Sequence, residues 1–352
     1  MKELILAGGG HGHILVLKEL MKRPLKGFHV TLITDYPKQY YSGMLSGYVE
    51  GVYTEEDISF NVPDLCDRAS VRYMEETITA VDKEKRVIRT ENGEYPYDFL
   101  SMNLSVRSKE FFPLGNMAGT YVKPIGRIVE FENSLEKEDT AGKKLFIVGG
   151  GPSGMELAFS FREAYPDLSI TAATSREVCR RFNQKTRQKV RTLTEEKSIQ
   201  LLENTTITAL KNNEAISGET RFPFDYIILS TGFTGIDVNF RGFNISEDRF
   251  IWARDDLQVA ENTLAMGDMI NLKCYPTLDK AGVFAIREAP VLLNNLMALL
   301  KGGKKRDYKP QTRYLQILNC GSKKAILNWG NLSLYGHMSW RLKDYIDRKY
   351  MN

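Results

Sequence analysis

Two glycine-rich turns contain the residues whose types and spacing point most directly to chemistry. The first turn, Gly8–His13, follows the apolar run Leu4–Ala7 and precedes an apolar helical pattern. A short strand, a tight turn and a helix N-terminus together present free N–H groups and partial positive charge, which is how the pyrophosphate of a dinucleotide is bound. Gly8 and Gly10 let the backbone turn sharply and approach phosphate, but His13 replaces the third glycine of the G-x-G-x-x-G pattern.

A second turn repeats this design. Gly149–Gly154 follows the apolar run Leu145–Val148, and here the third glycine, Gly154, is present. One imperfect pattern is weak evidence because glycine turns between strands and helices are common, so the repetition carries most of the weight. Two such turns in one chain predict two bound dinucleotides, one of which can pass electrons to the other.

Longer stretches of sequence also recur. Residues 95–100 (Tyr-Pro-Tyr-Asp-Phe-Leu) and 222–227 (Phe-Pro-Phe-Asp-Tyr-Ile) match in character at every position and follow their glycine turns at similar distances. An internal repeat of this kind predicts a duplicated folding unit. We therefore predict an α/β fold with two Rossmann-like dinucleotide-binding domains and a small C-terminal α+β extension. A duplicated fold that has kept no cofactor is the alternative.

These elements divide the chain into three predicted parts. The first domain comprises residues 1–117 and 233–305, the second comprises 118–232, and the extension comprises 306–352. In the extension, residues 314–318 and 325–329 read as strands, and 337–352 as a basic helix with an apolar face formed by Met338, Leu342, Tyr345 and Ile346. We expect this amphipathic helix to dock on its own domain; membrane contact and dimerisation are the alternatives.

Composition limits the function classes. The net charge of +4 over 352 residues is too small to indicate nucleic-acid binding, and no apolar run is long enough to predict a spanning helix. A first strand that begins at Lys2 leaves no room for a signal peptide, so we expect a cytoplasmic protein. The cysteines (Cys66, Cys179, Cys274 and Cys320) contain no close pair, and the four histidines do not join them in a ligand set. We therefore predict no metal site and no redox dithiol.

The order of these motifs resembles the flavoproteins with two dinucleotide folds. Those are the type II NADH dehydrogenases, the sulfide:quinone oxidoreductases and the pyridine nucleotide–disulfide reductases. A narrower resemblance is to the NADH-dehydrogenase-like branch also found fused ahead of selenide–water dikinases. The motifs that carry it are Gly8–His13, Tyr41–Leu45, Val122–Ile125, Lys280–Arg287 and Trp340–Arg348.

The resemblance implies a non-covalent FAD on the first fold. Asp268 would accept a hydrogen bond from the ribityl chain, and Lys280 would lie near the flavin pyrimidine ring and favour the anionic reduced flavin; a solvent-facing cap is the alternative for Lys280. Asp35 would bind the adenosine ribose or merely open a turn, and His13 would contact the pyrophosphate. The predicted FAD residues are Gly8, Gly10, His11, Gly12, His13, Thr34, Asp35, Ser42, Gly43, Met44, Ile78, Asn103, Lys123, Gly267, Asp268, Lys280, Ala281 and Gly282.

The second fold would bind NAD(P)H. Thr174, Ser175 and Arg176 stand where an NAD-selective site would carry an acid, and a hydroxyl with an arginine suits a 2′-phosphate better. We therefore expect NADPH to be preferred over NADH. Arg180 and Arg181 would assist this binding; a solvated basic helix face is the alternative for these two residues. The predicted NAD(P)H residues are Gly149, Gly151, Ser153, Gly154, Glu156, Ser175, Arg176 and Gly232.

Three departures from the family pattern bear on the acceptor. Asn103-Leu104-Ser105 stands where relatives usually carry Ala-Thr-Gly, residues 286–289 replace the glutamine-rich quinone segment, and Ser160 replaces a second glutamate that would follow Glu156. We predict an FAD-dependent NAD(P)H dehydrogenase that passes electrons to a quinone or another small acceptor, cytoplasmic or peripheral on the inner face of the membrane. The alternatives are a flavoenzyme acting on a sulfur or selenium substrate, and a flavin-bound interaction protein with a vestigial nicotinamide site.

Overall fold

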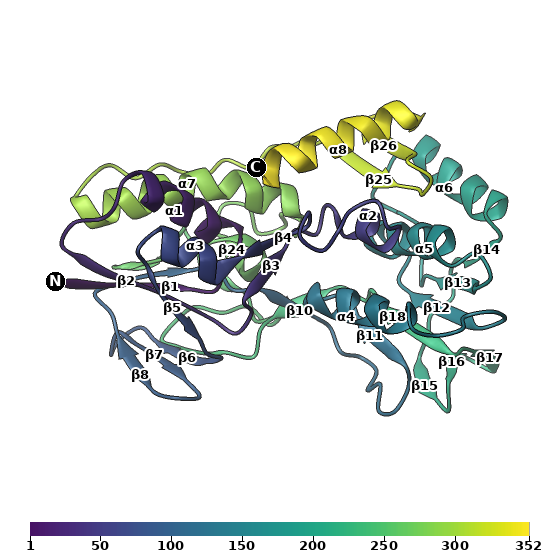
Figure 1. Cartoon of the computed structure of the whole chain (residues 1–352), viewed down its shortest axis with the longest axis horizontal. Coiled ribbons are helices and arrows are strands. Elements are labelled where there is room, and N and C mark those ends of the chain that lie inside the picture. The colour runs from purple at the N-terminus through teal and green to yellow at the C-terminus, as the bar shows by residue number, and fades with distance from the viewer. Residues whose placement is uncertain (352) are drawn as a thin grey trace. The chain divides into compact units, whose positions relative to one another are not determined.

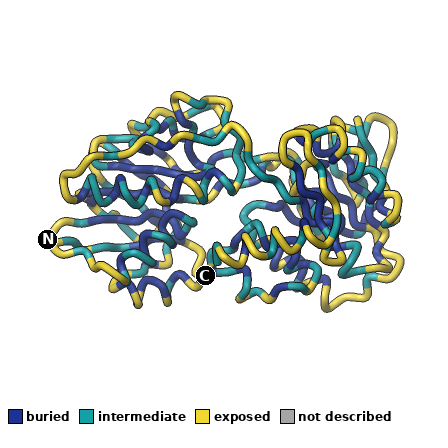
Figure 2. The backbone as a smooth tube through the Cα atoms, turned by 90° about the horizontal axis from the view of Figure 1, so that it is seen from above, coloured by how far each residue is buried: buried dark blue, intermediate teal, exposed yellow. Residues whose placement is uncertain are grey.

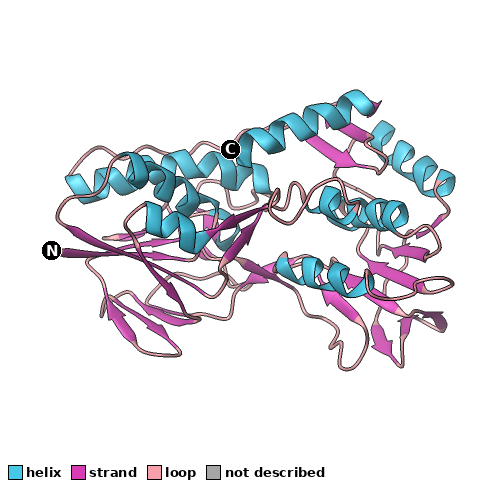
Figure 3. Ribbon diagram, in the orientation of Figure 1, coloured by secondary structure: helices cyan, strands magenta, loops and turns pink. Residues whose placement is uncertain are grey.

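A computed structural model describes residues 1–351, which separate into two compact units. Unit 1 consists of Met1–Gln39, Ser59–Arg107 and Thr234–Gln311; unit 2 consists of Tyr40–Ile58, Ser108–Phe233 and residues 312–351. The chain passes between the units five times: within β3 (Lys38–Tyr40), just before β4 (Ser59–Asn61), within β10 (Val106–Ser108), within β19 (Phe233–Gly235) and between Gln311 and Thr312. Both units combine helices with sheets, as Figure 3 shows.

Unit 1 is built on a six-stranded sheet with the strand order β22-β23-β9-β1-β2-β5. Its strands are β1 (Lys2–Ala7), β2 (Phe28–Thr34), β5 (Arg72–Glu75), β9 (Phe99–Met102), β22 (Gln258–Ala260) and β23 (Thr263–Ala265). All neighbours are parallel except the edge pair β22–β23. Figure 1 shows α1 (His11–Lys22), α3 (Val62–Arg68) and α7 (Gly282–Lys301) along one face of this sheet. Burial on both faces explains the apolar sequence of β1.

Smaller sheets complete unit 1. The sheet β20-β6-β7-β8 contains β6 (Ile78–Asp82), β7 (Val87–Thr90), β8 (Glu94–Pro96) and β20 (Asn239–Arg241). The pairs β6–β7 and β7–β8 are antiparallel hairpins. A further pair joins β21 (Ile251–Ala253) to β24 (Ile270–Leu272), with the 3₁₀ turn η1 (Gly267–Met269) just before β24.

Unit 2 repeats the main sheet with the order β11-β18-β12-β13-β14. The strands are β11 (Gly119–Tyr121), β12 (Lys144–Val148), β13 (Ser169–Ala173), β14 (Ile199–Leu202) and β18 (Tyr226–Leu229), all parallel. The strand after each glycine turn is the next neighbour on one side (β2 and β13), and the strand of the repeated segment is the neighbour on the other (β9 and β18). This correspondence confirms the predicted α/β class with two Rossmann-like folds. β12, β13 and β18 are mostly buried, and Figure 2 shows buried backbone in dark blue inside the exposed yellow segments.

Helices and a small meander surround the second sheet. The helices are α2 (Leu45–Val49), α4 (Gly126–Leu135), α5 (Pro152–Ala164) and α6 (Gln184–Glu196); the meander is β15 (Ala209–Lys211), β16 (Glu214–Ser217) and β17 (Thr220–Pro223). The C-terminal region forms three antiparallel strands rather than the predicted two: β25 (Gln316–Asn319), β26 (Ala325–Trp329) and β27 (Leu332–Gly336). Helix α8 (His337–Met351) follows directly, and Asn352, the last residue of the predicted helix, lies outside the described residues.

The grouping of segments differs from the predicted division at several boundaries. Residues 40–58 and 108–117 are predicted in the first domain but pack with unit 2, residues 306–311 are predicted in the extension but pack with unit 1, and residues 312–351 pack with unit 2 instead of forming a separate extension. Polar contacts between residues 40–58 and the C-terminal region, described below, account for the grouping of those two segments. Which cofactor each unit binds stays a prediction.

Candidate dinucleotide sites

The first glycine turn is held by Asn103 at the end of β9. Gly8 has a φ of +91°, and a Cβ there would lie 2.5 Å from the Asn103 carbonyl oxygen, so only glycine fits. The Asn103 side-chain oxygen accepts the Gly12 N–H at 2.7 Å, and its Nδ2 donates to the Met266 carbonyl at 3.4 Å. One side chain therefore ties the start of α1 to the turn that carries Gly267 and Asp268. This gives a structural role to the asparagine that departs from the family pattern.

His13 has a different role from the predicted pyrophosphate contact. Its ring is fully buried, with Nδ1 2.6 Å from the Gly8 carbonyl and Nε2 2.8 Å from the Ser101 hydroxyl. Because a carbonyl only accepts, Nδ1 carries the proton and Nε2 accepts from Ser101. Burial lowers the pKa of His13 to about 4, although the bond to Gly8 opposes this shift. Both ring nitrogens therefore form hydrogen bonds within the protein. The neutral His13, on α1, stabilises the glycine turn through its bond to the Gly8 carbonyl.

A charged cluster, formed by the buried Glu288 and the half-buried Asp268 and Lys280, lies where α7 begins. Gly267 donates its N–H to Glu288 Oε2 at 2.6 Å, and Lys280 donates to the Ile270 carbonyl while its amine lies 4.5 Å from the centre of the Phe250 ring. Burial lowers the pKa of Lys280, against the opposing charges of Asp268 and Glu288. Lys280 is therefore not a solvent-facing cap. Its proximity to the flavin stays a prediction.

The other residues predicted for FAD are divided between the units. Thr34 ends β2, Ile78 begins β6, and Ala281 and Gly282 form the start of α7, which has no side-chain cap to occupy its N–H groups. Asp35 follows β2 directly, so its two predicted roles both stay open. These residues, together with Gly8–His13 and Asn103, belong to unit 1, whereas Ser42, Gly43, Met44 and Lys123 belong to unit 2.

The second glycine turn has the geometry of an open anion site. Gly149 has a φ of +123°, and a Cβ at Gly154 would lie 1.9 Å from the Gly149 carbonyl oxygen, so both positions require glycine for close packing. Gly151 differs, because its φ is −73° and no atom lies within 4 Å of where a Cβ would stand. Helix α5 begins at Pro152 without a side-chain cap. Its N-terminal N–H groups are thus available to a phosphate.

Two of the predicted NAD(P)H features are now placed. Ser175 and Arg176 follow β13 on the surface, in the position suited to an adenosine ribose, with Arg180 and Arg181 also exposed nearby in sequence. Gly232 has a φ of +88° and open space at its Cβ. Glu156, by contrast, accepts the Asn319 N–H at 2.7 Å, so its carboxylate is engaged by the C-terminal strand β25.

Sequence reasoning missed a carboxylate beside Ser160. The Ser160 hydroxyl donates to Glu50 Oε1 at 3.2 Å, and Asn319 donates its side-chain amide to the same carboxylate. Burial raises the pKa of Glu50 to about 7, although both hydrogen bonds oppose this shift. The glutamate that the resemblance expects at position 160 is absent, and a carboxylate from the end of α2 lies against that position instead.

Helix α8 docks through its polar side. Lys343 donates to Asp347 at 2.7 Å and to the Gly43 carbonyl, and Tyr41 donates to Asp347 at 3.0 Å. Tyr53 likewise donates to Asp344 at 2.7 Å. The predicted apolar face, in contrast, is exposed, with Met338 at 74% and Tyr345 at 63%. The helix docks on its own unit as expected, but with the opposite face.

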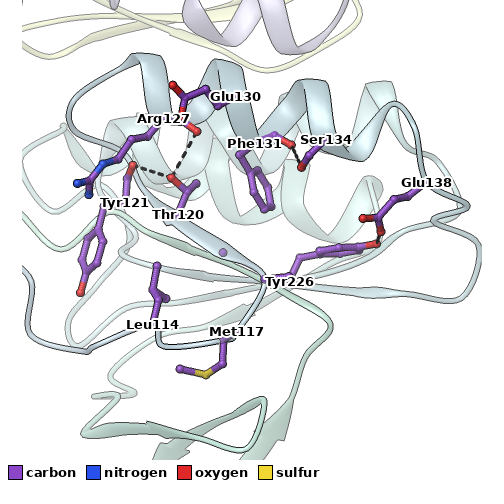
Figure 4. A pocket seen from close by; sticks show the side chains of 12 residues that line it. Leu114, Met117, Thr120, Tyr121, Arg127, Glu130, Phe131, Ser134, Glu138 and Tyr226 are labelled. Carbon is purple, nitrogen blue, oxygen red and sulfur yellow. Dashed lines mark hydrogen bonds between the residues drawn. The ribbon is translucent and has the colours of Figure 1, made fainter. Parts of the chain in front are cut away.

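A surface cleft of about 510 Å³ lies away from the glycine turn of unit 2, between α4 and the strands β11 and β18 (Figure 4). Thr120, Phe131 and Tyr226 line it, together with the carboxylates Glu130 and Glu138. Two carboxylates make this cleft unsuited to a pyrophosphate. Within residues 1–351, no three or more His, Cys, Asp or Glu side chains are grouped to hold a metal ion.

The apolar helix α7 is a core element. It is the one helix in the described part of the chain that is long and apolar enough to cross a membrane. Its buried residues include Phe284, Leu292 and Leu296, and a Cβ at Gly12 of α1 would lie 2.9 Å from Leu292. Packing against α1 therefore accounts for its composition.

Comparison with known proteins agrees with this architecture. The sequence profile of the pyridine nucleotide-disulphide oxidoreductases matches residues 2–289. The NADH dehydrogenase-like protein YutJ of Bacillus subtilis is 24% identical over 92% of this chain and 91% of its own. A type II NADH:quinone oxidoreductase of Staphylococcus saprophyticus is 22% identical over 47% of this chain and 44% of its own.

Solved structures share the fold at low sequence identity. The sulfide:quinone oxidoreductase of Aquifex aeolicus superposes with a TM-score of 0.81 at 16% identity, covering 100% of this chain and 91% of that one. The narrower resemblance to the branch fused to dikinases stays a prediction. Since the profile spans most of the chain and both dinucleotide turns are present, the chain belongs to the pyridine nucleotide-disulphide oxidoreductases, as an oxidoreductase that uses FAD and NADH or NADPH.

Proposed function

We propose that the protein is an FAD-dependent NAD(P)H dehydrogenase. Bound NAD(P)H would supply a hydride, and bound FAD would accept it and deliver the electrons to a quinone or another small acceptor. The observation that carries this proposal is the second glycine turn, where Gly149 and Gly154 are sterically required and Gly151 faces open space. Packing alone would keep Gly149 and Gly154, but a vestigial nicotinamide site would not need a glycine at position 151, where no protein contact requires one.

The chain's own residues bind and orient the cofactors. The N-terminus of α1, held by Asn103, would face the FAD pyrophosphate, and the N-terminus of α5 would face that of NAD(P)H. The half-buried ammonium of Lys280 would stabilise negative charge on the reduced flavin. When bound, FAD supplies the chemistry of accepting a hydride and releasing its electrons.

The test combines the visible spectrum with one glycine variant. Under anaerobic conditions, NADPH or NADH should bleach the flavin band near 450 nm (roughly, as is usual for oxidised flavin). Gly151→Ala should keep the fold and the FAD, because its Cβ meets no protein atom, but should raise the nucleotide concentration needed for bleaching at least tenfold. Gly93→Ala, in the β7–β8 hairpin, is the matched control and should behave as wild type.

Each other outcome has a defined meaning. A yellow protein that neither nucleotide bleaches contradicts the dehydrogenase and favours a flavoenzyme for a sulfur or selenium substrate, or a flavin-bound interaction protein. A colourless protein contradicts the FAD site itself. Unchanged bleaching in Gly151→Ala contradicts the placement of the nucleotide on α5.

We further propose that NADPH is preferred. Arg176 is exposed three residues after the end of β13, and Thr174 and Ser175 precede it instead of an acid, which favours a 2′-phosphate over a free ribose hydroxyl. The next residue, Glu177, is paired with Arg187 and Arg191. Arg176→Ala should lower kcat/KM for NADPH about tenfold and leave that for NADH unchanged, as expected for one charge-assisted contact. Equal use of both nucleotides by the wild type would contradict this preference.

A quinone acceptor and membrane contact are the remaining parts of the proposal. The name of the staphylococcal relative supports the quinone. The outward apolar face of α8, flanked by the exposed Arg341 and Lys349, suits a surface of anionic lipid. The protein should sediment with anionic liposomes, and Met338→Asp with Tyr345→Asp should abolish this. A concentration-dependent dimer without liposome binding would instead assign this face to a second copy.

A further inference from the structure

Helix α7 contains a buried carboxylate that the proposed function does not use. Glu288 is 3% exposed and lies one helical turn from two buried apolar residues, Phe284 and Leu292. Its Oε2 accepts the Gly267 N–H at 2.6 Å. A single hydrogen bond is little compensation for removing a carboxylate from water, so this position is costly for a purely structural residue.

The neighbouring charges come from three segments. Asp268 follows the residue that Glu288 binds and adds negative charge, while Lys280, just before α7, adds positive charge. Tyr308, buried in the segment after α7, also lies within the electrostatic reach of Glu288. Burial is the main cause that raises the pKa of Glu288 to about 7; the Gly267 hydrogen bond opposes the shift, and Asp268 increases it. Near neutral pH, one added charge is enough to change the protonation state of such a group.

We propose that Glu288 is the proton-exchanging group of the flavin site, taking up one proton when the flavin is reduced and releasing it when the flavin is reoxidised. This rests on the proposed function, in which FAD lies beside Asp268 and Lys280. Asp268 and Lys280 are predicted cofactor contacts, and Glu288 is bonded to the peptide N–H that precedes Asp268. The carboxylate is therefore placed to respond to charge that develops on the cofactor.

The step balances in both directions. NAD(P)H transfers two electrons and one proton as hydride, which leaves one additional negative charge in the site, and Glu288 takes one proton from solvent. On reoxidation by a quinone, two electrons and one proton leave the flavin. The proton released by Glu288 is the second one that the quinol requires.

The first measurement is proton uptake on anaerobic reduction in weakly buffered solution. The pH is about 8, above the pKa of about 7 to which burial raises Glu288, so that Glu288 starts ionised in the oxidised protein. With one equivalent of NADPH, the wild type should take up about one proton per flavin and Glu288→Gln about none. Glutamine keeps an oxygen for the Gly267 N–H, so the fold is retained. Glu132→Gln is the matched control, because Glu132 is a buried glutamate of unit 2 whose pKa burial also raises; its uptake should equal that of the wild type.

Electrochemical reduction separates this proposal from the proposed function. Without a nucleotide, the wild type should take up about two protons per flavin and Glu288→Gln about one, even if NAD(P)H proves not to be the donor. An infrared difference spectrum should show a protonated carboxyl band on reduction that Glu288→Gln lacks. Equal proton uptake in wild type and Glu288→Gln, or uptake of only one proton by the electrochemically reduced wild type, would overturn the proposal.

Discussion

The buried pair of Lys343 and Asp347 provides the sharpest stability prediction. The side chains are 13% and 6% exposed, and Lys343 also donates to the Gly43 carbonyl. Burial alone would lower the pKa of Lys343. The carboxylates of Asp347 and Glu156 outweigh this effect and raise the pKa of Lys343 above its ordinary value. Lys343 is therefore charged at neutral pH, and its removal leaves Asp347 buried without its cation.

Lys343→Met should lower the free energy of unfolding by about 3 kcal/mol. Breaking a buried pair by removing one partner costs about 3 to 5 kcal/mol, against less than about 1 kcal/mol for an exposed pair. The lower end applies because Tyr41 still donates to Asp347 at 3.0 Å and because burial already raises the pKa of that carboxyl. The Asp347 carboxyl, left without its cation, can then bind a proton, so the loss should shrink as the pH falls below neutral.

Urea unfolding measures the free energy of unfolding of each variant, and hydrogen exchange shows which residues lose stability. Two units need not unfold in one transition, so the loss should show as faster exchange in residues 40–58 and 337–351. The matched control is Lys349→Met on the exposed side of α8, which should change stability by less than about 0.5 kcal/mol. Adding Asp347→Leu to Lys343→Met should recover most of the loss. A single-variant loss below about 1 kcal/mol, or additive losses in the double variant, would refute the reasoning.

Three other predictions concern the glycine turns. Burial lowers the pKa of His13 from 6.5 to about 4. Between these two pH values the unfolded chain therefore binds more protons at His13 than the folded protein does. As the pH falls through that window, the free energy of unfolding of the wild type should decrease by up to about 3 kcal/mol relative to that of His13→Asn. Urea titrations of both proteins test this, because the opposite contributions of Glu50 and Glu288 cancel in the difference; parallel pH curves would contradict a buried neutral imidazole. Asn103→Ala leaves the Gly12 N–H without its acceptor and should weaken FAD binding about tenfold in reconstitution of the apoprotein, whereas an unchanged Kd would remove Asn103 from the site. Gly154→Ala places a Cβ 1.9 Å from a carbonyl oxygen and should destabilise unit 2 in thermal melts, unlike Gly151→Ala; equal melting temperatures would disprove the packing argument.

Local patterns predicted the fold well. The strand–turn–helix sequences at Gly8 and Gly149 and the repeated segments near Asp98 and Asp225 specify two parallel sheets, because such sheets are buried on both faces and read as apolar runs. Each of these signals is contained within a few consecutive residues. No tertiary contact is needed to recognise it.

Long-range contacts could not be predicted in this way. His13 looked like a ligand contact because its partner Ser101 lies on another strand, and α8 looked like a helix docked by its apolar face because its polar partners lie in residues 41–57. Glu288 did leave a signal, since it occurs in phase with Phe284 and Leu292 on the buried side of α7. An acidic residue at a helical position otherwise occupied by buried apolar residues can be recognised in a sequence. The backbone N–H that this residue binds cannot be recognised in that way.

The bond between Tyr41 and Asp347 joins residues that are 306 positions apart in the chain. During translation, residues 40–58 leave the ribosome long before the helix that fixes them has been made. They remain without these partners until the 306 positions from Tyr41 to Asp347 have been synthesised. Unit 2 therefore cannot complete its structure in the order in which it is translated, because the packing of residues 40–58 against α8 forms only after α8 has been made.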